Sequence, residues 1–73
     1  MESLKPFDIL RNKTGSEVIV SLKNDEAYRG VLDSFDIHLN LVLSETKLIL
    51  ESKELEVGKI LIRGDNILTV RNL

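Results

Sequence analysis

The chain contains no cysteine, so neither a disulfide nor a thiolate metal site can form within it. It has a single histidine, His38, which excludes a multi-histidine metal site in one copy, and we expect no metal and no cofactor. No charge of one sign dominates, because 10 Lys and Arg stand against 12 Asp and Glu to give a net charge of −2. Any nucleic-acid site would therefore be local rather than a broad cationic surface.

Long apolar runs are also absent. None approaches the roughly 18 residues that a membrane helix needs, so we expect no membrane partner. The segment 1–5 lacks the pattern of a signal peptide. These absences predict an intracellular, cytoplasmic protein.

The chain is short for the amount of apolar surface it carries. With 73 residues it is expected to form a single domain over 1–73, although 42% of its residues are hydrophobic. Domains below about 70–80 residues usually need a source of stability beyond their own core, such as disulfides, a bound metal or oligomerisation. Because disulfides and metal are excluded, self-association is the stabilising interaction that remains.

The pattern of apolar and polar residues predicts one short helix followed by short strands. Ser3 can cap the helix, Pro6 is tolerated in its first turn, and Gly15 follows its end. Gly30 and Gly58 fall inside two of the expected strands, where glycine is typical of a bend. We expect the helix over about 3–12 and the strands over about 16–22, 26–35, 39–50, 55–63 and 66–71. The fold class is therefore mainly β, a small curled antiparallel sheet or partial barrel.

Polar and apolar residues alternate in the middle of the chain, from 35 to 41. The two sets are Asp36, His38 and Asn40 on one parity, and Phe35, Ile37, Leu39 and Leu41 on the other. In an extended chain, one set would face solvent while the other anchored it to the core. A strand rarely exceeds about 10 residues, so we also expect a short loop between two strands here. Two interpretations stay open: a small polar site, or polar residues that only form a turn.

Two segments near the end of the chain are apolar on both parities, Ile60-Leu61-Ile62 and Ile67-Leu68. An outer strand with two apolar faces is an aggregation hazard unless something covers it. Another copy of the chain is the natural cover. Pairing of the fourth strand of one copy with the fifth strand of the next is head-to-tail, and such contacts can close into a ring.

Two groups of residues resemble the motifs of the Sm and Sm-like (LSm) proteins. The first motif is matched by Gly15-Ser16-Glu17-Val18-Ile19-Val20-Ser21-Leu22-Lys23, by Tyr28, Gly30 and Leu32, and by Asp36-Ile37-His38-Leu39-Asn40. The second is matched by Ile60-Leu61-Ile62-Arg63-Gly64-Asp65-Asn66-Ile67. The resemblance covers essentially the whole chain. Leu39 is a mild departure, since many members have methionine there.

The resemblance implies the Sm fold, in which a short helix precedes a strongly bent, five-stranded antiparallel sheet of the SH3-like partial-barrel type. It implies a ring, usually of seven copies, closed through the fourth and fifth strands. It also implies binding of single-stranded, U-rich RNA at the inner rim of the pore, with a role in RNA processing and no catalysis. The short connection between the third and fourth strands and the missing C-terminal tail look like the archaeal members, whose rings contain one chain type.

Roles for individual residues follow from the same resemblance. His38 and Arg63 are expected to sandwich a uracil ring, and Asn40 is expected to read its edge. Gly64 is expected to let the backbone approach the nucleotide. The roles of two carboxylates are our own hypotheses rather than part of the resemblance. Turn chemistry predicts that Asp36 mainly forms the loop. Because the turn Arg63-Gly64-Asp65 lies at the family's base site, we expect Asp65 to accept from the Asn40 amide and so to select uracil over cytosine.

Other functions remain to be weighed against this one. The bacterial RNA chaperone that shares the fold differs in its second motif, and the turn Arg63-Gly64-Asp65-Asn66 argues against it. A hydrolase could use His38 and Asp36 as an acid–base pair, but we see no clustered carboxylates or lysine to complete such a site. A structural oligomer without RNA function predicts that substitutions of His38 and Arg63 leave oligo-uridine binding unchanged. No small-molecule substrate is expected.

Overall fold

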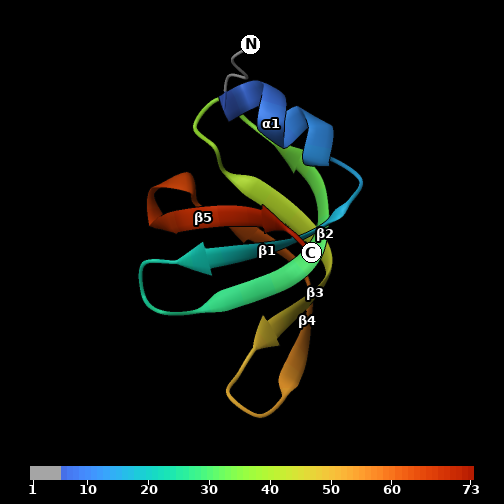
Figure 1. The fold of residues 1–73 in the computed structure, drawn as a ribbon, viewed down its shortest axis with the longest axis vertical. Helices are drawn as coiled ribbons and strands as arrows, with labels where there is room; N and C mark the ends of the chain where they lie inside the picture. Colours follow the sequence, from blue (N-terminus) through green and yellow to red (C-terminus); the bar gives the residue numbers. More distant parts are fainter. Residues whose placement is uncertain (1–5) are drawn as a thin grey trace.

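A computed structural model describes residues 6–73, and Figure 1 shows its arrangement. One short helix precedes five strands, as expected from the sequence. The elements are α1 (Pro6–Lys13), β1 (Glu17–Leu22), β2 (Ala27–Phe35), β3 (Leu41–Ile49), β4 (Glu54–Ile62), the short 3₁₀ turn η1 (Gly64–Asn66) and β5 (Ile67–Asn72). The expected cap of the helix, Ser3, lies outside the described residues. No helix within 6–73 has the length and apolarity needed to cross a membrane.

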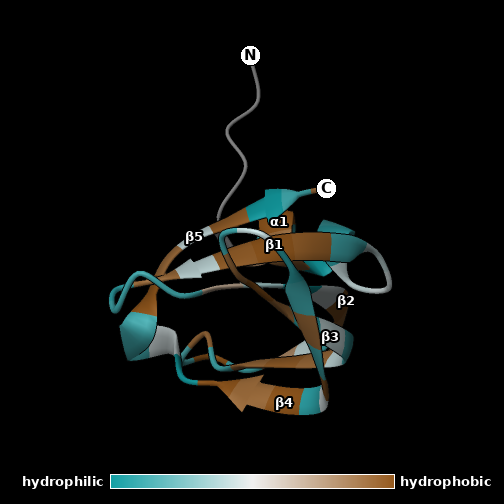
Figure 2. Ribbon diagram, turned by 90° about the horizontal axis from the view of Figure 1, so that it is seen from below, coloured by the Kyte–Doolittle hydropathy of each residue, from teal (hydrophilic) through white to brown (hydrophobic). Residues whose placement is uncertain are grey.

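All strand pairs are antiparallel, and the strand order is β4-β3-β2-β1-β5. Both edges of the sheet are therefore supplied by the last two strands of the chain. Figure 2 shows the sheet curling, with β1 and β5 on one side of the molecule and β4 on the other. The fold class predicted from the sequence, a helix and a bent five-stranded sheet, is confirmed.

The sheet bends where two glycines face a β-bulge in β3. A Cβ on Gly30 would lie 2.9 Å from the Thr46 Oγ1 atom and 3.0 Å from the Ser44 carbonyl oxygen, so only glycine lets β3 pack this closely on β2. The β2–β3 register shifts at Gly30 itself, between Arg29 and Val31, and again between Leu32 and Ser34. On the other side of β3, Thr46 pairs with Gly58, whose φ of +77° favours glycine. Both bends were placed correctly by the sequence pattern.

The core fills the inside of the curled sheet. Its buried members come from α1 and from four strands: Leu10, Val18, Val20, Leu22, Leu32, Leu41, Leu43 and Ile62. The alternation in β1 predicts this burial, since every second residue of that strand is buried. The helix closes one end of the barrel, where the Phe7 and Phe35 rings meet edge to face with centroids 5.0 Å apart.

Candidate nucleic-acid interface

Two turns from distant parts of the sequence meet at one corner of the sheet. The segment 36–40 joins β2 to β3, and the segment 63–66 joins β4 to β5. The pairing of Leu41 with Ile62 brings the two turns side by side. Between them is an open depression of about 500 Å³, and its lining residues are His38, Asn40, Arg63, Gly64 and Asp65. Five of the six expected site residues thus line one surface, and the sixth, Asp36, forms hydrogen bonds with two of them, His38 and Asn40.

Asp36 organises the first turn through its carboxylate. Its Oδ1 atom accepts from the backbone N–H groups of His38 at 2.9 Å and Asn40 at 3.0 Å, and its Oδ2 atom accepts from the Asn40 side-chain amide at 3.0 Å. The hydrogen bond from that amide is the main reason why the pKa of Asp36 lies below its usual value. The expected role of Asp36 as a loop-former therefore has a direct structural basis.

The side chain of Asn40 is held at both ends of its amide. The Gly64 N–H donates to Asn40 Oδ1 at 2.8 Å, while Asn40 Nδ2 donates to Asp36. A flipped amide would face a donor with its NH2 group and a carboxylate with its oxygen, so only one orientation satisfies both partners. The expected contact between Asp65 and this amide is not made. Asp65 instead lies 3.5 Å from the Arg63 guanidinium, and Asp36 takes the orienting position.

Gly64 is tightly packed against the other turn. A Cβ at this position would collide with the carbonyl oxygen of His38 and would lie 2.9 Å from the carbonyl group of Leu39. The sequence predicts glycine here as the means for the backbone to approach a nucleotide. In the structure, the close approach is to the backbone of the segment 36–40, and it allows the hydrogen bond to Asn40.

The apolar residues of the first turn do not anchor it in the manner expected. Ile37 is 77% exposed and Leu39 is 36% exposed, although Leu41 is fully buried. The reason is that the backbone turns at Asp36 and Leu39 adopts a φ of +63°, so the alternation of an extended strand does not apply. The expected third strand begins at Leu41 rather than at Leu39. The turn is fixed by hydrogen bonds instead of by burial.

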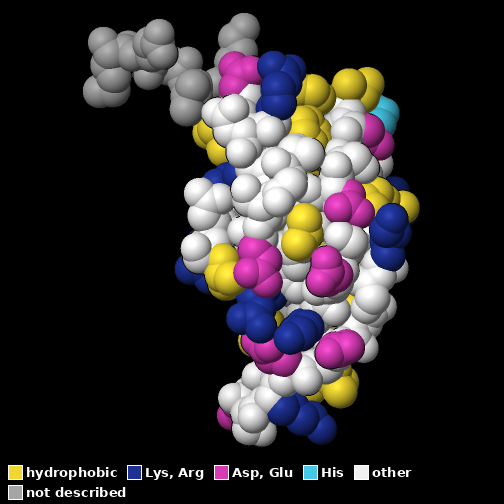
Figure 3. Space-filling model, turned by 90° about the vertical axis from the view of Figure 1, so that its right-hand side faces the viewer, with side chains coloured by type: hydrophobic (Ala, Val, Ile, Leu, Met, Phe, Trp, Pro, Cys, Tyr) yellow, Lys and Arg dark blue, Asp and Glu magenta, His cyan; other side chains and the backbone are white. Residues whose placement is uncertain are grey.

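The depression is not a basic surface. Arg63 and Asp65 are both largely exposed and lie close enough to form an ion pair. Asp36, which accepts from the Asn40 amide, is a further carboxylate next to the depression. On the face that Figure 3 shows, acidic and basic side chains are interspersed and no patch of one sign forms. Among residues 6–73, no three His, Asp or Glu side chains gather as metal ligands would.

A third turn, which the sequence pattern does not connect to this site, is joined to the turn that precedes β5. The backbone N–H of Lys23, at the start of the β1–β2 connection, donates to the Asn66 carbonyl oxygen at 2.8 Å. The two residues are more than 40 positions apart, and no local sequence pattern predicts their contact. The Lys23 residue is exposed, as is typical of a lysine in a turn.

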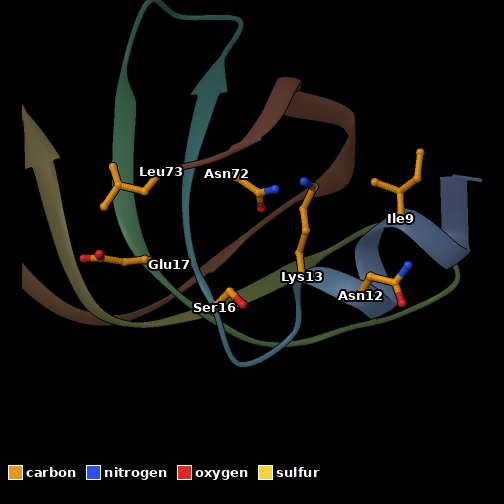
Figure 4. Close-up of a pocket in the computed structure, with 7 residues that line it drawn as sticks. All are labelled: Ile9, Asn12, Lys13, Ser16, Glu17, Asn72 and Leu73. Atoms are coloured by element: carbon orange, nitrogen blue, oxygen red, sulfur yellow. The ribbon is translucent and has the colours of Figure 1, made fainter.

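A larger hollow of about 600 Å³ lies elsewhere, between α1 and the end of β5. Figure 4 shows Lys13 and Asn72 pointing into the space between these elements. The hollow is open and shares no residue with the depression described above; its lining is Ile9, Asn12, Lys13, Ser16, Glu17, Asn72 and Leu73.

Comparison with known proteins decides the family. Residues 8–72 match the model of the LSM domain. The chain belongs to the LSM family. A Thermococcus sibiricus protein described as snRNP Sm-like is 43% identical to it over 67 residues, covering 90% of this chain and 88% of that protein.

Solved structures agree with this membership. The Pyrococcus abyssii Sm protein, in complex with a uridine heptamer, is 37% identical to this LSM protein with a TM-score of 0.89, and the match covers 96% of this chain and 100% of that one. The SmAP1 heptamer of P. aerophilum is 29% identical with a TM-score of 0.92, covering 99% and 97%.

Proposed function

We propose that this LSM protein forms a homo-oligomeric ring, most simply a heptamer, and binds single-stranded U-rich RNA at the inner rim of the pore. It acts as a binding module in RNA processing, without catalysis, in the cytoplasm. The single observation that carries the proposal is the depression in which His38, Asn40 and Arg63 converge with the Asn40 amide fixed. The uridine heptamer bound by the P. abyssii relative supports the choice of ligand.

The flat side chains of the site suit a nucleobase. An imidazole and a guanidinium can stack on opposite faces of one ring, and base stacking of this kind contributes about 1–3 kcal/mol per base. His38 and Arg63 lie on different turns, so a base can enter between them. Sequence-specific recognition of single strands uses this combination of stacking and contacts to the base edge.

The fixed amide of Asn40 explains a preference for uracil. Its two internal hydrogen bonds leave one hydrogen on Nδ2 and one lone pair on Oδ1 for a ligand. Uracil presents an acceptor at O4 beside a donor at N3, which complements that pair. Cytosine presents the opposite polarity at both positions. Selection of uracil thus depends on the partners that prevent the amide from flipping.

The same geometry argues against a hydrolase. In an acid–base pair the Asp36 carboxylate would contact the His38 ring, yet it accepts from the backbone N–H of His38 and from Asn40 instead. A carboxylate that already accepts three hydrogen bonds within its own turn is a poor general base, because these bonds favour its ionised form. Its interactions support a structural role.

Ring formation follows from the position of the two free edges. β4 and β5 are the outer strands of the sheet, and Leu61 and Leu68 on these strands are 65% and 62% exposed. Edge strands with exposed apolar residues are covered in native proteins. A head-to-tail contact between β4 of one copy and β5 of the next covers both, and the P. aerophilum relative is a heptamer.

Substitution of the stacking residues tests the proposed function. His38→Ala and Arg63→Ala should each weaken binding of a fluorescent oligo-uridine by about 1–3 kcal/mol per bound base, which is roughly 5- to 150-fold. Fluorescence anisotropy measures this, with native mass spectrometry to verify that the ring persists. Affinities that stay at the wild-type value in both variants would favour a structural oligomer.

A second pair of variants tests how uracil is selected. In Asp36→Asn the new amide keeps an oxygen for the backbone N–H groups but presents an NH2 group to the Asn40 amide, so the fixed orientation is lost. We expect the preference for oligo-uridine over oligo-cytidine to fall by about 1–2 kcal/mol, or roughly 5- to 30-fold. Asp65→Ala should leave that ratio unchanged. If competition binding shows that Asp65→Ala lowers this preference and Asp36→Asn does not, Asp65 rather than Asp36 orients the Asn40 amide.

The pH dependence of the turn follows from the same carboxylate. The pKa of Asp36 is lowered in the folded chain, chiefly by the hydrogen bond from the Asn40 amide, so its stabilising contribution is complete above the pKa of the unfolded chain. The contribution is lost as the pH falls through the lowered folded value. Titration between pH 7 and pH 5 should therefore leave the Asp36 contacts intact.

A further inference from the structure

The base site offers little net positive charge to attract the phosphates of an RNA strand. The positive charge of Arg63 faces the Asp65 carboxylate at 3.5 Å, and Asp36 adds a second carboxylate. Each nucleotide of an RNA strand brings a phosphate, and cationic contacts to phosphates normally provide much of the affinity. A cation outside the depression would therefore improve binding.

Several lysine and arginine side chains in 6–73 form no ion pair with a described carboxylate. Arg11, Arg29, Lys59 and Arg63 form ion pairs with nearby carboxylates. Within the part of the chain that the structure describes, no ion pair engages Lys13, Lys23, Lys47, Lys53 or Arg71. Position in the fold decides which of these cations can serve the base site.

Lys23 is joined by its backbone to the turn that carries the base-site residues Gly64 and Asp65. Lys13 also lines a pocket with Gly64, but that pocket contains neither His38 nor Arg63. The backbone N–H of Lys23 donates to the carbonyl oxygen of Asn66, the residue after Asp65, and the preceding Leu22 pairs with Ile67 at the start of β5. Figure 1 shows the β1–β2 turn on the same side of the molecule as the turn that precedes β5. By contrast, Lys53 lies in the β3–β4 turn, at the opposite end of the paired strands.

The surroundings of Lys23 leave its side chain accessible. Leu22 is buried in the core, whereas Lys23 is exposed. The acidic residue two places after Asn24, Glu26, is held away in its own contacts, because its carboxylate accepts from the Asn24 amide at 3.2 Å and from the Tyr28 hydroxyl at 3.3 Å. Asp25 is the remaining acidic neighbour in the turn and makes no ion pair with another described residue.

We propose that Lys23 binds the RNA backbone, its ammonium group contacting the phosphodiester of the nucleotide whose base lies between His38 and Arg63. The proposal rests on the proposed function of the site. A lysine is suited to this contact, since its compact charge sits on a flexible stem and needs no fixed geometry. Phosphate contacts position the strand without reading its sequence. In a ring, the contact repeats once for each copy.

The salt dependence of binding tests this proposal. We expect Lys23→Ala and Lys23→Gln to weaken oligo-uridine and oligo-cytidine binding by the same factor. The slope of log K against log salt should shrink by about 0.7 for each phosphate that the variant no longer neutralises. Lys23→Arg should retain the slope. None of these substitutions removes the backbone hydrogen bond to Asn66, and the matched control Lys53→Ala should equal the wild type.

The possible results separate this inference from the proposed function. If the wild type binds oligo-uridine and Lys23→Ala has the wild-type slope, the phosphate contact is disproved while the RNA-binding function stands. If Lys23→Ala changes the ratio between uridine and cytidine affinities, Lys23 acts on the base and the inference is wrong. If the wild type binds neither oligomer, the proposed function itself fails.

Discussion

Replacement of Gly64 by alanine should nearly abolish RNA binding. The new Cβ would collide with the His38 carbonyl oxygen and approach the Leu39 carbonyl group to 2.9 Å, and backbone atoms cannot move aside as a flexible side chain can. The two turns would separate, and the hydrogen bond from Gly64 to Asn40 would break as they did so. We expect a loss of about 2–4 kcal/mol per bound base, because stacking and edge contacts fail together. Overpacking should also destabilise the fold by about 1–3 kcal/mol.

Gly58→Ala provides the matched control. A Cβ there meets nothing within 4 Å, but the φ of +77° makes any side chain strained. It should cost about 1–2 kcal/mol of stability and leave oligo-uridine affinity close to the wild type. Urea denaturation and anisotropy measure the two effects separately. If Gly64→Ala binds oligo-uridine as tightly as Gly58→Ala does, the packing of the two turns is not what maintains the base site.

The sequence was sufficient to predict the architecture because its signals are local. The alternation of Val18, Val20 and Leu22 gives the buried face of β1, and polar segments give the turns. Gly30 and Gly58 mark the bends, since a glycine inside a strand is typical of a bulge or of a close backbone approach. Exposed edges could be anticipated from strands that are apolar on both faces, and Leu61 and Leu68 are indeed exposed.

The hydrogen bonds and the ion pair within the site are harder to predict from the sequence, because they depend on backbone geometry. The sequence places both Asp36 and Asp65 near the site, but only the three-dimensional structure distinguishes which of them reaches the Asn40 amide. The turn that exposes Ile37 brings Asp36 onto that amide, while Asp65 remains beside Arg63. A sequence pattern that assumes extended chain cannot represent this reversal.

The hydrogen bond between Lys23 and Asn66 illustrates a second limit. It joins residues from different hairpins, and it is made by backbone atoms that nearly every residue type has. Composition and motif spacing carry no signal for such a bond. It becomes visible only when the register between β1 and β5 is known, because Leu22 then stands beside Ile67.

Affinity should depend on assembly as strongly as on any single contact. One copy presents a single shallow site, and its net charge opposes binding to a polyanion. Identical sites that are linked on a ring convert each further binding step on the same strand into an intramolecular one. Such linkage can raise affinity by about 10²- to 10⁴-fold without any new type of contact. In the proposed ring, the interface between copies is thus as important for RNA affinity as the base site.

Leu68→Lys should therefore disperse the ring and reduce oligo-uridine affinity by about 10²- to 10⁴-fold. Leu68 is 62% exposed on the free edge of β5, so a lysine is tolerated in a single copy, but burial of its charge between copies is costly. Ile37→Lys is the control for oligomeric state, because Ile37 is still more exposed but lies on a turn rather than on a free edge. Native mass spectrometry should show single copies for Leu68→Lys and intact rings for Ile37→Lys. Intact rings in both variants would exclude the β5 edge as the assembly surface, whereas a dispersed Leu68→Lys that keeps wild-type affinity would show that one copy binds RNA on its own.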